Sequence, residues 1–215
     1  MTRHVMDARA QSCNSTVSAI AAFYALSSAR AHRIRIIGGR YRGRIVRFPA
    51  ASELRPTPDR VRETLFNWLG QDLTGRRTLD LYCGTGILSL EALSRGAVLA
   101  VAVDRNPILV HSVETVAASF GAVGLEARVA DAQAFLAREA RAFDVVFLDP
   151  PFETDLWPWL LPRAIARLAP GGFVYAEAGR EILPPGGAFT WRHARAGQVH
   201  YHLMRADAPA EASTE

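Results

Sequence analysis

Short apolar segments alternate with helical segments from Arg77 onward, and this alternation restricts the fold more than any other feature of the sequence. Five segments are predicted strands: 77–82, 98–103, 125–130, 143–148 and 172–177. Four segments between them are predicted helices: 86–95, 107–119, 131–140 and 155–168. Crossovers of more than about ten residues join parallel strands, so the pattern predicts a parallel sheet covered on both faces. Two further predicted strands, 188–193 and 198–205, would close the sheet as a hairpin.

The composition is that of one globular domain. The chain has 215 residues, of which 49% are hydrophobic and 21% charged, and it contains no run of eighteen apolar residues. These values argue against a membrane-spanning helix and against a largely disordered chain. Cys13 and Cys83 are the only cysteines and have no metal-ligand neighbours in the sequence, which favours a reducing, cytoplasmic compartment without a disulfide or a metal site.

A strongly basic segment precedes the alternating region. Residues 33–62 hold nine arginines against Glu53 and Asp59, which gives a local charge of +7 in a chain whose net charge is +4. Alternating isoleucines and arginines, a glycine-containing turn and a second apolar run predict a β-hairpin with its arginines directed outward. A basic element on a near-neutral body favours a polyanionic partner such as nucleic acid. A merely solvated basic face is the alternative.

A glycine-bearing turn follows the first strand of the alternating region, in the run Leu79-Asp80-Leu81-Tyr82-Cys83-Gly84-Thr85-Gly86. Turns at the carboxyl edge of open α/β sheets let the backbone approach a nucleotide. The G-x-G-x-x-G pattern of dinucleotide sites is incomplete, because Ser89 occupies the third glycine position, and the chain has no lysine for a phosphate-binding loop. Asp80 would repel a pyrophosphate and favours a cationic ligand. A purely structural turn is the alternative.

Acidic residues stand at the ends of three successive predicted strands. Asp104, at the end of the second strand, can accept hydrogen bonds from both hydroxyls of a ribose. Asp131, after the third, can accept one from an adenine amine or serve only as a helix N-cap. With Asp80, they describe a pocket for an adenosine that carries a positive tail, as in S-adenosylmethionine. We expect this pocket to be formed by Asp80, Tyr82, Cys83, Gly84, Thr85, Gly86, Asp104, Arg105, Asp131 and Ala132.

The run Asp149-Pro150-Pro151-Phe152 ends the fourth predicted strand. Two prolines remove two backbone donors and stiffen the turn, so the Asp149 carboxylate and the Pro150 carbonyl can both accept hydrogen bonds from one exocyclic base amine. The Phe152 ring can stack on the base, which contributes about 1–3 kcal/mol in single-strand binders. Holding a weakly nucleophilic amine against an electrophilic methyl group is a positioning task. We therefore predict these four residues to be catalytic, with a proline-stiffened turn of no such role as the alternative.

These motifs resemble the bacterial methyltransferases that modify N2 of a guanine in 16S ribosomal RNA (RsmD-type). The resemblance extends from Arg33 to Arg205. It rests on several separate blocks: Arg35 to Gly39, Arg55 to Thr57, Asp59 to Leu69, Leu79 to Leu81 with Gly84 to Gly86, Glu91 to Ala97, Asp149 to Phe152, and Gly197 to Val199 with Tyr201. It implies a Rossmann-like class I S-adenosylmethionine-dependent methyltransferase fold, α/β, whose seven-stranded, mostly parallel sheet has a reversed last strand, plus a small N-terminal β-hairpin.

The residue pattern also predicts a division of the chain. We expect a poorly ordered extension over 1–32, a basic RNA-facing hairpin and linker over 33–56, the methyltransferase domain over 57–205 and a flexible tail over 206–215. Thr57 and Pro58 are predicted as N-cap and first-turn residue of a helix that ends near Gly70. The resemblance implies 16S ribosomal RNA, alone or within a small ribosomal subunit, as the partner, and we expect the protein to be a monomer. The RNA phosphates are assigned to Arg33, Arg35, Arg40, Arg42, Arg44, Arg55 and Arg62.

Other functions fit less of the sequence. A DNA methyltransferase acting on adenine N6 or cytosine N4 could use the same proline motif and base extrusion, but 215 residues leave no room for a separate target-recognition domain. A non-catalytic RNA-binding module would need the arginines but not the acids at four strand ends. An NAD-dependent oxidoreductase is disfavoured by the missing third glycine.

Overall fold

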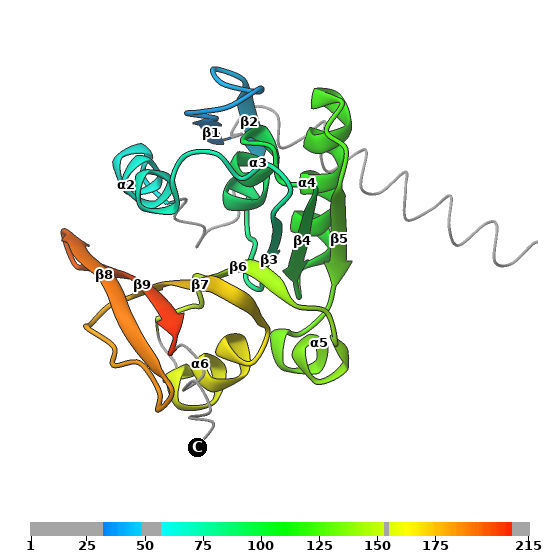
Figure 1. Cartoon of the computed structure of the whole chain (residues 1–215). Helices are drawn as coiled ribbons and strands as arrows, with labels where there is room; N and C mark the ends of the chain where they lie inside the picture. Colours follow the sequence, from blue (N-terminus) through cyan, green and yellow to red (C-terminus); the bar gives the residue numbers. More distant parts are fainter. Residues whose placement is uncertain (1–31, 49–56, 153–154, 208–215) are drawn as a thin grey trace, which may run out of the picture.

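The computed structural model describes residues 32–48, 57–152 and 155–207. They form a seven-stranded sheet of order β5-β4-β3-β6-β7-β9-β8 and a separate two-stranded sheet, β1-β2 (Figure 1). The strands are β1 (His32–Arg35), β2 (Ile45–Phe48), β3 (Arg77–Asp80), β4 (Leu99–Asp104), β5 (Leu125–Val129), β6 (Phe143–Leu148), β7 (Leu168–Ala178), β8 (Ala188–Ala196) and β9 (Val199–Ala206). The helices are α2 (Asp59–Leu69), α3 (Ile87–Ser94), α4 (Pro107–Phe120), α5 (Ala132–Arg138) and α6 (Trp157–Ile165).

The larger sheet confirms the expected topology. β3 to β7 are parallel to one another, whereas β9 runs antiparallel to both β7 and β8. The reversed strand is thus the last in sequence, as the resemblance implied. β7 begins earlier than predicted, at Leu168, because this residue pairs with Phe143 before the register shifts. The expected extension up to residue 31, the linker with Arg55 and most of the C-terminal tail lie outside the described residues.

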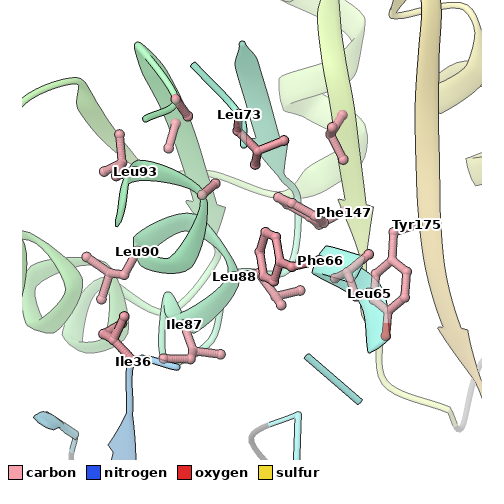
Figure 2. Close-up of a cluster of buried hydrophobic side chains, with 14 of the residues drawn as sticks. Ile36, Leu65, Phe66, Leu73, Ile87, Leu88, Leu90, Leu93, Phe147 and Tyr175 are labelled. Carbon is pink, nitrogen blue, oxygen red and sulfur yellow. The ribbon is translucent and has the colours of Figure 1, made fainter. Parts of the chain in front are cut away.

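Hydrophobic packing covers both faces of the large sheet. On one face, the β1–β2 hairpin, α2 and α3 share a cluster with side chains of β6, β7 and β9; Figure 2 shows Ile36, Phe66, Phe147 and Tyr175 among them. On the other face, α5 and α6 pack in a second cluster (Figure 1). The hairpin therefore contributes its apolar side to the main core. Among the described residues, no helix is long and apolar enough to cross a membrane.

The start of α2 differs from the prediction. Thr57 is not its N-cap; Pro58 occupies that position, without a side-chain capping hydrogen bond, and the helix begins at Asp59. The Thr57 carbonyl instead accepts a hydrogen bond from Nε of Arg62. The end of the helix is as predicted, because Gly70 adopts the left-handed conformation that ends many helices (φ 93°).

Candidate functional site

Acidic side chains lie at the carboxyl ends of five neighbouring strands. Parallel strands end at the same edge of a sheet, so these residues share one edge. We call them the carboxyl rim: Asp80 at the end of β3, Asp104 at the end of β4, Asp131 after β5, Asp149 after β6 and Glu177 in β7. Four of the five were predicted from the sequence, and the structure brings all of them to this edge.

The glycine turn after β3 is fixed to the next strand. Gly84 and Gly86 have positive φ angles of 50° and 70°. A Cβ atom on Gly86 would lie 2.5 Å from Val113 of α4, so only glycine allows this approach of α3 to α4. The Gly84 amide donates to Oδ2 of Asp104 (3.0 Å), and the Asn106 amide donates to Oδ1 (2.8 Å). The turn and the Asp104 carboxylate thus hold each other in place.

Asp80 is almost fully buried under the first turn of α3. The Ser89 hydroxyl donates to its Oδ2 (3.0 Å). Burial, with smaller contributions from the nearby Asp104 and Glu177, raises the pKa of Asp80 to about 7, although the hydrogen bonds from Ser89 oppose the shift. A cation placed beside Asp80 would stabilise its ionised form. Ser89, which in the sequence only marked an absent glycine, is therefore the hydrogen-bonding partner of a rim residue.

Asp131 caps α5. Its Oδ1 accepts hydrogen bonds from the amides of Gln133 (2.9 Å) and Ala134 (3.1 Å), so the capping interpretation is confirmed. Both bonds use one oxygen of the carboxylate. Tyr82 is half-buried near this end of the rim, and burial raises its pKa to about 12, with Asp131 acting in the same direction and Arg105 against it. These electrostatic effects indicate that Tyr82, Arg105 and Asp131 lie near one another.

The proline motif forms the next part of the rim. We call Asp149, Pro150, Pro151 and Phe152 the base corner. Leu148 pairs with Ala176, which places Asp149 beside Glu177 on adjacent strands. Burial, followed by the charges of Glu177 and Asp80, raises the pKa of Asp149 well above its usual value. Phe152 is 52% exposed and packs against Gly179, so one large aromatic ring stands open at the corner.

Glu177 is the rim residue that the sequence analysis missed. It is buried, and it accepts hydrogen bonds from the hydroxyls of Tyr175 (2.9 Å) and Thr57. Burial raises its pKa, and the two hydrogen bonds act against that shift. An acid near the end of an otherwise apolar strand was a usable signal, since the same reasoning had identified Asp104. The contact with Thr57 joins the start of α2 to the rim.

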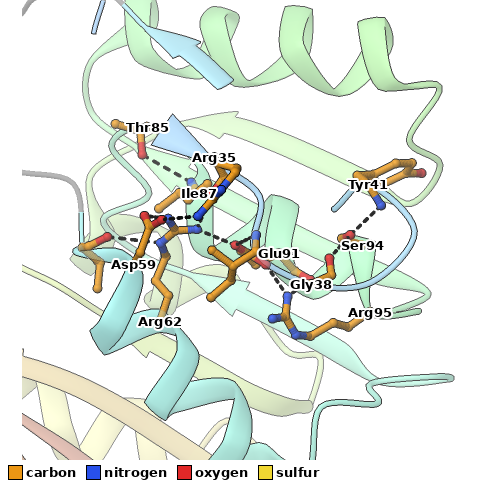
Figure 3. A network of polar contacts seen from close by, with 12 residues as sticks. Arg35, Gly38, Tyr41, Asp59, Arg62, Thr85, Ile87, Glu91, Ser94 and Arg95 are labelled. Carbon is orange, nitrogen blue, oxygen red and sulfur yellow. Dashed lines mark hydrogen bonds and ion pairs between the residues drawn. The ribbon is translucent and has the colours of Figure 1, made fainter. Parts of the chain in front are cut away.

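Arg62 was predicted to contact RNA, and that prediction is wrong. Its side chain is fully buried and donates to the carbonyls of Thr57 and Arg35, to Oδ1 of Asp59 (2.5 Å) and to Oε1 of Glu91 (Figure 3). Burial lowers its pKa, against the opposing effects of Glu91 and Asp59. A phosphate has no access to this guanidinium.

Glu91 is the centre of this buried network. It pairs with Arg62 and Arg95 and accepts a hydrogen bond from the Ile37 amide (2.8 Å). Nearby, the Ser94 hydroxyl donates to the Gly38 carbonyl (2.5 Å) (Figure 3). Three of the sequence blocks that carried the resemblance, in the hairpin, α2 and α3, are thereby one structural unit that attaches the hairpin to the domain.

The remaining hairpin arginines differ in their contacts. Arg33, Arg40 and Arg42 are exposed, and Arg35 makes one exposed, 3.5 Å ion pair with Asp59. Arg44 is exposed too, but its guanidinium donates to the carbonyls of Ser119 and Phe120 at the end of α4 (both 3.0 Å) and lies over the Phe120 ring. Arg44 therefore already has partners within the protein.

The fold indicates the class of protein to which this site belongs. A parallel sheet with a reversed last strand, whose first glycine turn faces carboxylates rather than phosphate-binding groups, is that of a class I S-adenosylmethionine-dependent methyltransferase. The model of the family described as "Conserved hypothetical protein 95" matches residues 34–205. The chain belongs to this family.

Curated relatives agree with that assignment. Ribosomal RNA small subunit methyltransferase D of Escherichia coli (strain K12) is 36% identical over 192 residues, which cover 85% of this chain and 95% of the relative. A protein of the same name from Haemophilus influenzae is 32% identical over 186 residues, covering 80% of this chain and 93% of the relative.

Solved structures are similar as well. The Escherichia coli protein yhhF has a TM-score of 0.74 and 36% identity, covering 83% of this chain and 100% of that one. The Thermus thermophilus 16S rRNA N2 G1207 methyltransferase, solved in complex with AdoMet and guanosine, has a TM-score of 0.63 and 25% identity, covering 83% of this chain and 50% of that one.

Proposed function

We propose that this protein transfers a methyl group from S-adenosylmethionine to the exocyclic N2 amine of a guanine in 16S ribosomal RNA. The observation that carries the proposal is the base corner beside the carboxyl rim, in which Asp80 and Glu177 are buried and their charges help to raise the pKa of Asp149. The names of the relatives support ribosomal RNA as the substrate. The guanosine in the Thermus thermophilus complex supports guanine as the base.

The rim has the chemistry that the methyl donor requires. S-adenosylmethionine supplies an electrophilic methyl group on a positively charged sulfur. Asp104, held by two backbone amides, is oriented to accept hydrogen bonds from ribose hydroxyls. Asp131 retains its second carboxylate oxygen for the adenine amine. Asp80, whose pKa is raised to about 7, gains a counter-charge when a cation occupies the rim, which favours its ionised form.

The base corner has the task of orienting the acceptor amine. The Asp149 carboxylate and the Pro150 carbonyl accept the two amine hydrogens, which directs the nitrogen lone pair away from them and toward the donor. Phe152 provides the exposed ring on which the extruded base stacks. Glu177 lies beside Asp149 and raises its pKa, so it acts on the protonation state of Asp149 from the neighbouring strand.

The hairpin has the task of binding RNA phosphates. Arg33, Arg35, Arg40 and Arg42 are four of its exposed cations, and Arg35 and Arg42 line an open groove of about 540 Å³ beside α2. The hairpin turn contacts Ser94 at the C-terminal end of α3, about 12 Å along that helix from its N-terminus at the rim. The arginines of the turn, Arg40 and Arg42, therefore serve RNA backbone away from the target base, whereas Arg35 lies beside Asp59 at the start of α2, which is joined to the rim.

A labelled-methyl assay tests the proposal. Protein-free 16S RNA, the small ribosomal subunit and double-stranded DNA are incubated separately with the enzyme and labelled S-adenosylmethionine, and the modified nucleoside is then identified. We expect label in N2-methylguanosine from RNA or the subunit, and none from DNA. Label in a DNA base, or in RNA at a position other than the guanine N2 amine, would contradict the proposal.

A further inference from the structure

Two exposed aromatic rings lie on the outermost strand of the large sheet. Among the phenylalanine, tyrosine and tryptophan side chains that the structure describes, only Phe152, Phe189 and Trp191 are exposed, and Phe152 belongs to the base corner. Phe189 is 38% and Trp191 is 41% exposed, with their ring centroids 6.2 Å apart at a steep angle. Exposed rings of this size on an edge strand indicate a surface that binds a partner.

A β-bulge in β8 brings arginines onto these rings. Thr190 pairs with Met204 and Arg192 pairs with Leu203, so Trp191 is the extra residue. Adjacent residues of a regular strand point to opposite faces, but a bulge lets both face the same side. The Arg192 guanidinium consequently lies over the Trp191 ring, 5.1 Å from its centroid.

Arg205 of β9 extends the same arrangement. It pairs with Phe189 across the strands, and its guanidinium lies 5.5 Å from the Trp191 ring centroid and 5.1 Å from that of Phe173 in β7. Rings and guanidinium groups thus alternate over three neighbouring strands. We call this group the outer-strand patch: Phe173, Phe189, Trp191, Arg192 and Arg205.

The charge of this part of the sheet is all of one sign. Residues 188–206 contain Arg192, Arg195 and Arg205 and neither aspartate nor glutamate. None of these three arginines forms an ion pair with a carboxylate within the part of the chain that the structure describes. Charged residues alone would protect an edge strand from aggregation, but exposed tryptophan and phenylalanine do not serve that purpose.

We propose that the outer-strand patch is a second RNA contact, in which an unpaired base stacks on Trp191 while Arg192 and Arg205 hold the flanking phosphates. The inference rests on the proposed function, in which RNA is the substrate. Single-strand binders combine aromatic stacking with a cationic surface in this manner. An acidic protein surface would also attract the cations, and the variants below distinguish it from RNA.

The patch is separate from the base corner. Phe173 and Glu177 point to the same face of β7, about 13 Å apart along the strand. Tyr175 lies between them on this face, and Trp68 of α2 covers Tyr201, the cross-strand partner of Glu177, with ring centroids 5.4 Å apart. The patch therefore receives a nucleotide other than the one methylated, in a segment of the RNA near the target.

Three variants test this contact. Trp191→Ala removes the ring, Trp191→Phe keeps an aromatic platform, and Trp159→Ala removes a tryptophan on α6 that also has an arginine over its ring but lies on the opposite side of the sheet. We expect the Kd for protein-free 16S RNA to rise about tenfold in Trp191→Ala, to recover in Trp191→Phe and to stay unchanged in Trp159→Ala. The KM for RNA should follow the Kd, while kcat and the affinity for S-adenosylmethionine should not change.

Two results would overturn the inference. One is an unchanged RNA affinity in Trp191→Ala. The other is a loss of affinity for the small ribosomal subunit but not for protein-free RNA, which would identify a ribosomal protein as the partner. If the wild-type enzyme methylates RNA and Trp191→Ala behaves like it, only this inference fails; if the wild-type enzyme methylates no RNA, the proposed function fails first.

Discussion

Two groups of buried charged residues in this protein are built in opposite ways. Around Glu91, the charges of Arg62 and Arg95 are compensated and every group has a close partner. Along the carboxyl rim, burial raises the pKa of Asp80, Asp149 and Glu177. The charge of Glu177 also raises the pKa of Asp80 and of Asp149. A compensated cluster holds elements together, whereas like charges gathered at one edge are a feature of sites that await a ligand.

The largest expected effect tests the compensated group. Glu91→Gln leaves the buried Arg95 without a counter-charge and Arg62 with Asp59 alone, so the free energy of unfolding should fall by about 3–5 kcal/mol. Urea unfolding followed by circular dichroism measures this. Glu63→Gln, on an exposed position of α2, is the control and should change stability by less than about 0.5 kcal/mol. A similar small change in Glu91→Gln would show that the network does not stabilise the fold.

Asp80→Asn tests the rim through the pH dependence of the free energy of unfolding. The pKa of Asp80 is raised from 3.8 to about 7 in the folded state, so the folded state binds more protons than the unfolded chain between these values. Stability therefore falls as the pH rises from about 4 to about 7, by up to about 4 kcal/mol from this group. Asp80→Asn should flatten that fall, and Asp155→Asn, at an exposed position, should not. Equal pH profiles for wild type and Asp80→Asn would contradict the assignment.

The smallest effect distinguishes the hairpin arginines from one another. Arg40→Ala and Arg42→Ala should each reduce the slope of log affinity against log salt by about one, because each is proposed to contact a phosphate. Arg44→Ala is the matched control, since its guanidinium is bound to the end of α4, and should leave the slope unchanged. A reduced slope in Arg44→Ala alone would place the phosphate contacts elsewhere.

The sequence predicted what depends on local patterns. Apolar runs located the strands, and acids that follow them located Asp80, Asp104, Asp131 and Asp149. The role of Arg62 could not be read in this way, because its partner Glu91 is 29 residues away and only packing of α2 on α3 brings them together. Glu177 ends the predicted strand 172–177 and could have been identified by the same reasoning as Asp104, whereas the Trp191 contacts depend on a bulge that no residue pattern indicated.

The measurement that tests the account most directly compares turnover with donor binding in Asp149→Ala. With RNA and S-adenosylmethionine both saturating, the rate of methyl transfer should fall by about 100-fold or more, because the amine loses its principal acceptor. The calorimetric Kd for S-adenosylmethionine should stay within about twofold of wild type. A variant that retains wild-type turnover would show that the acceptor amine is held somewhere other than the base corner.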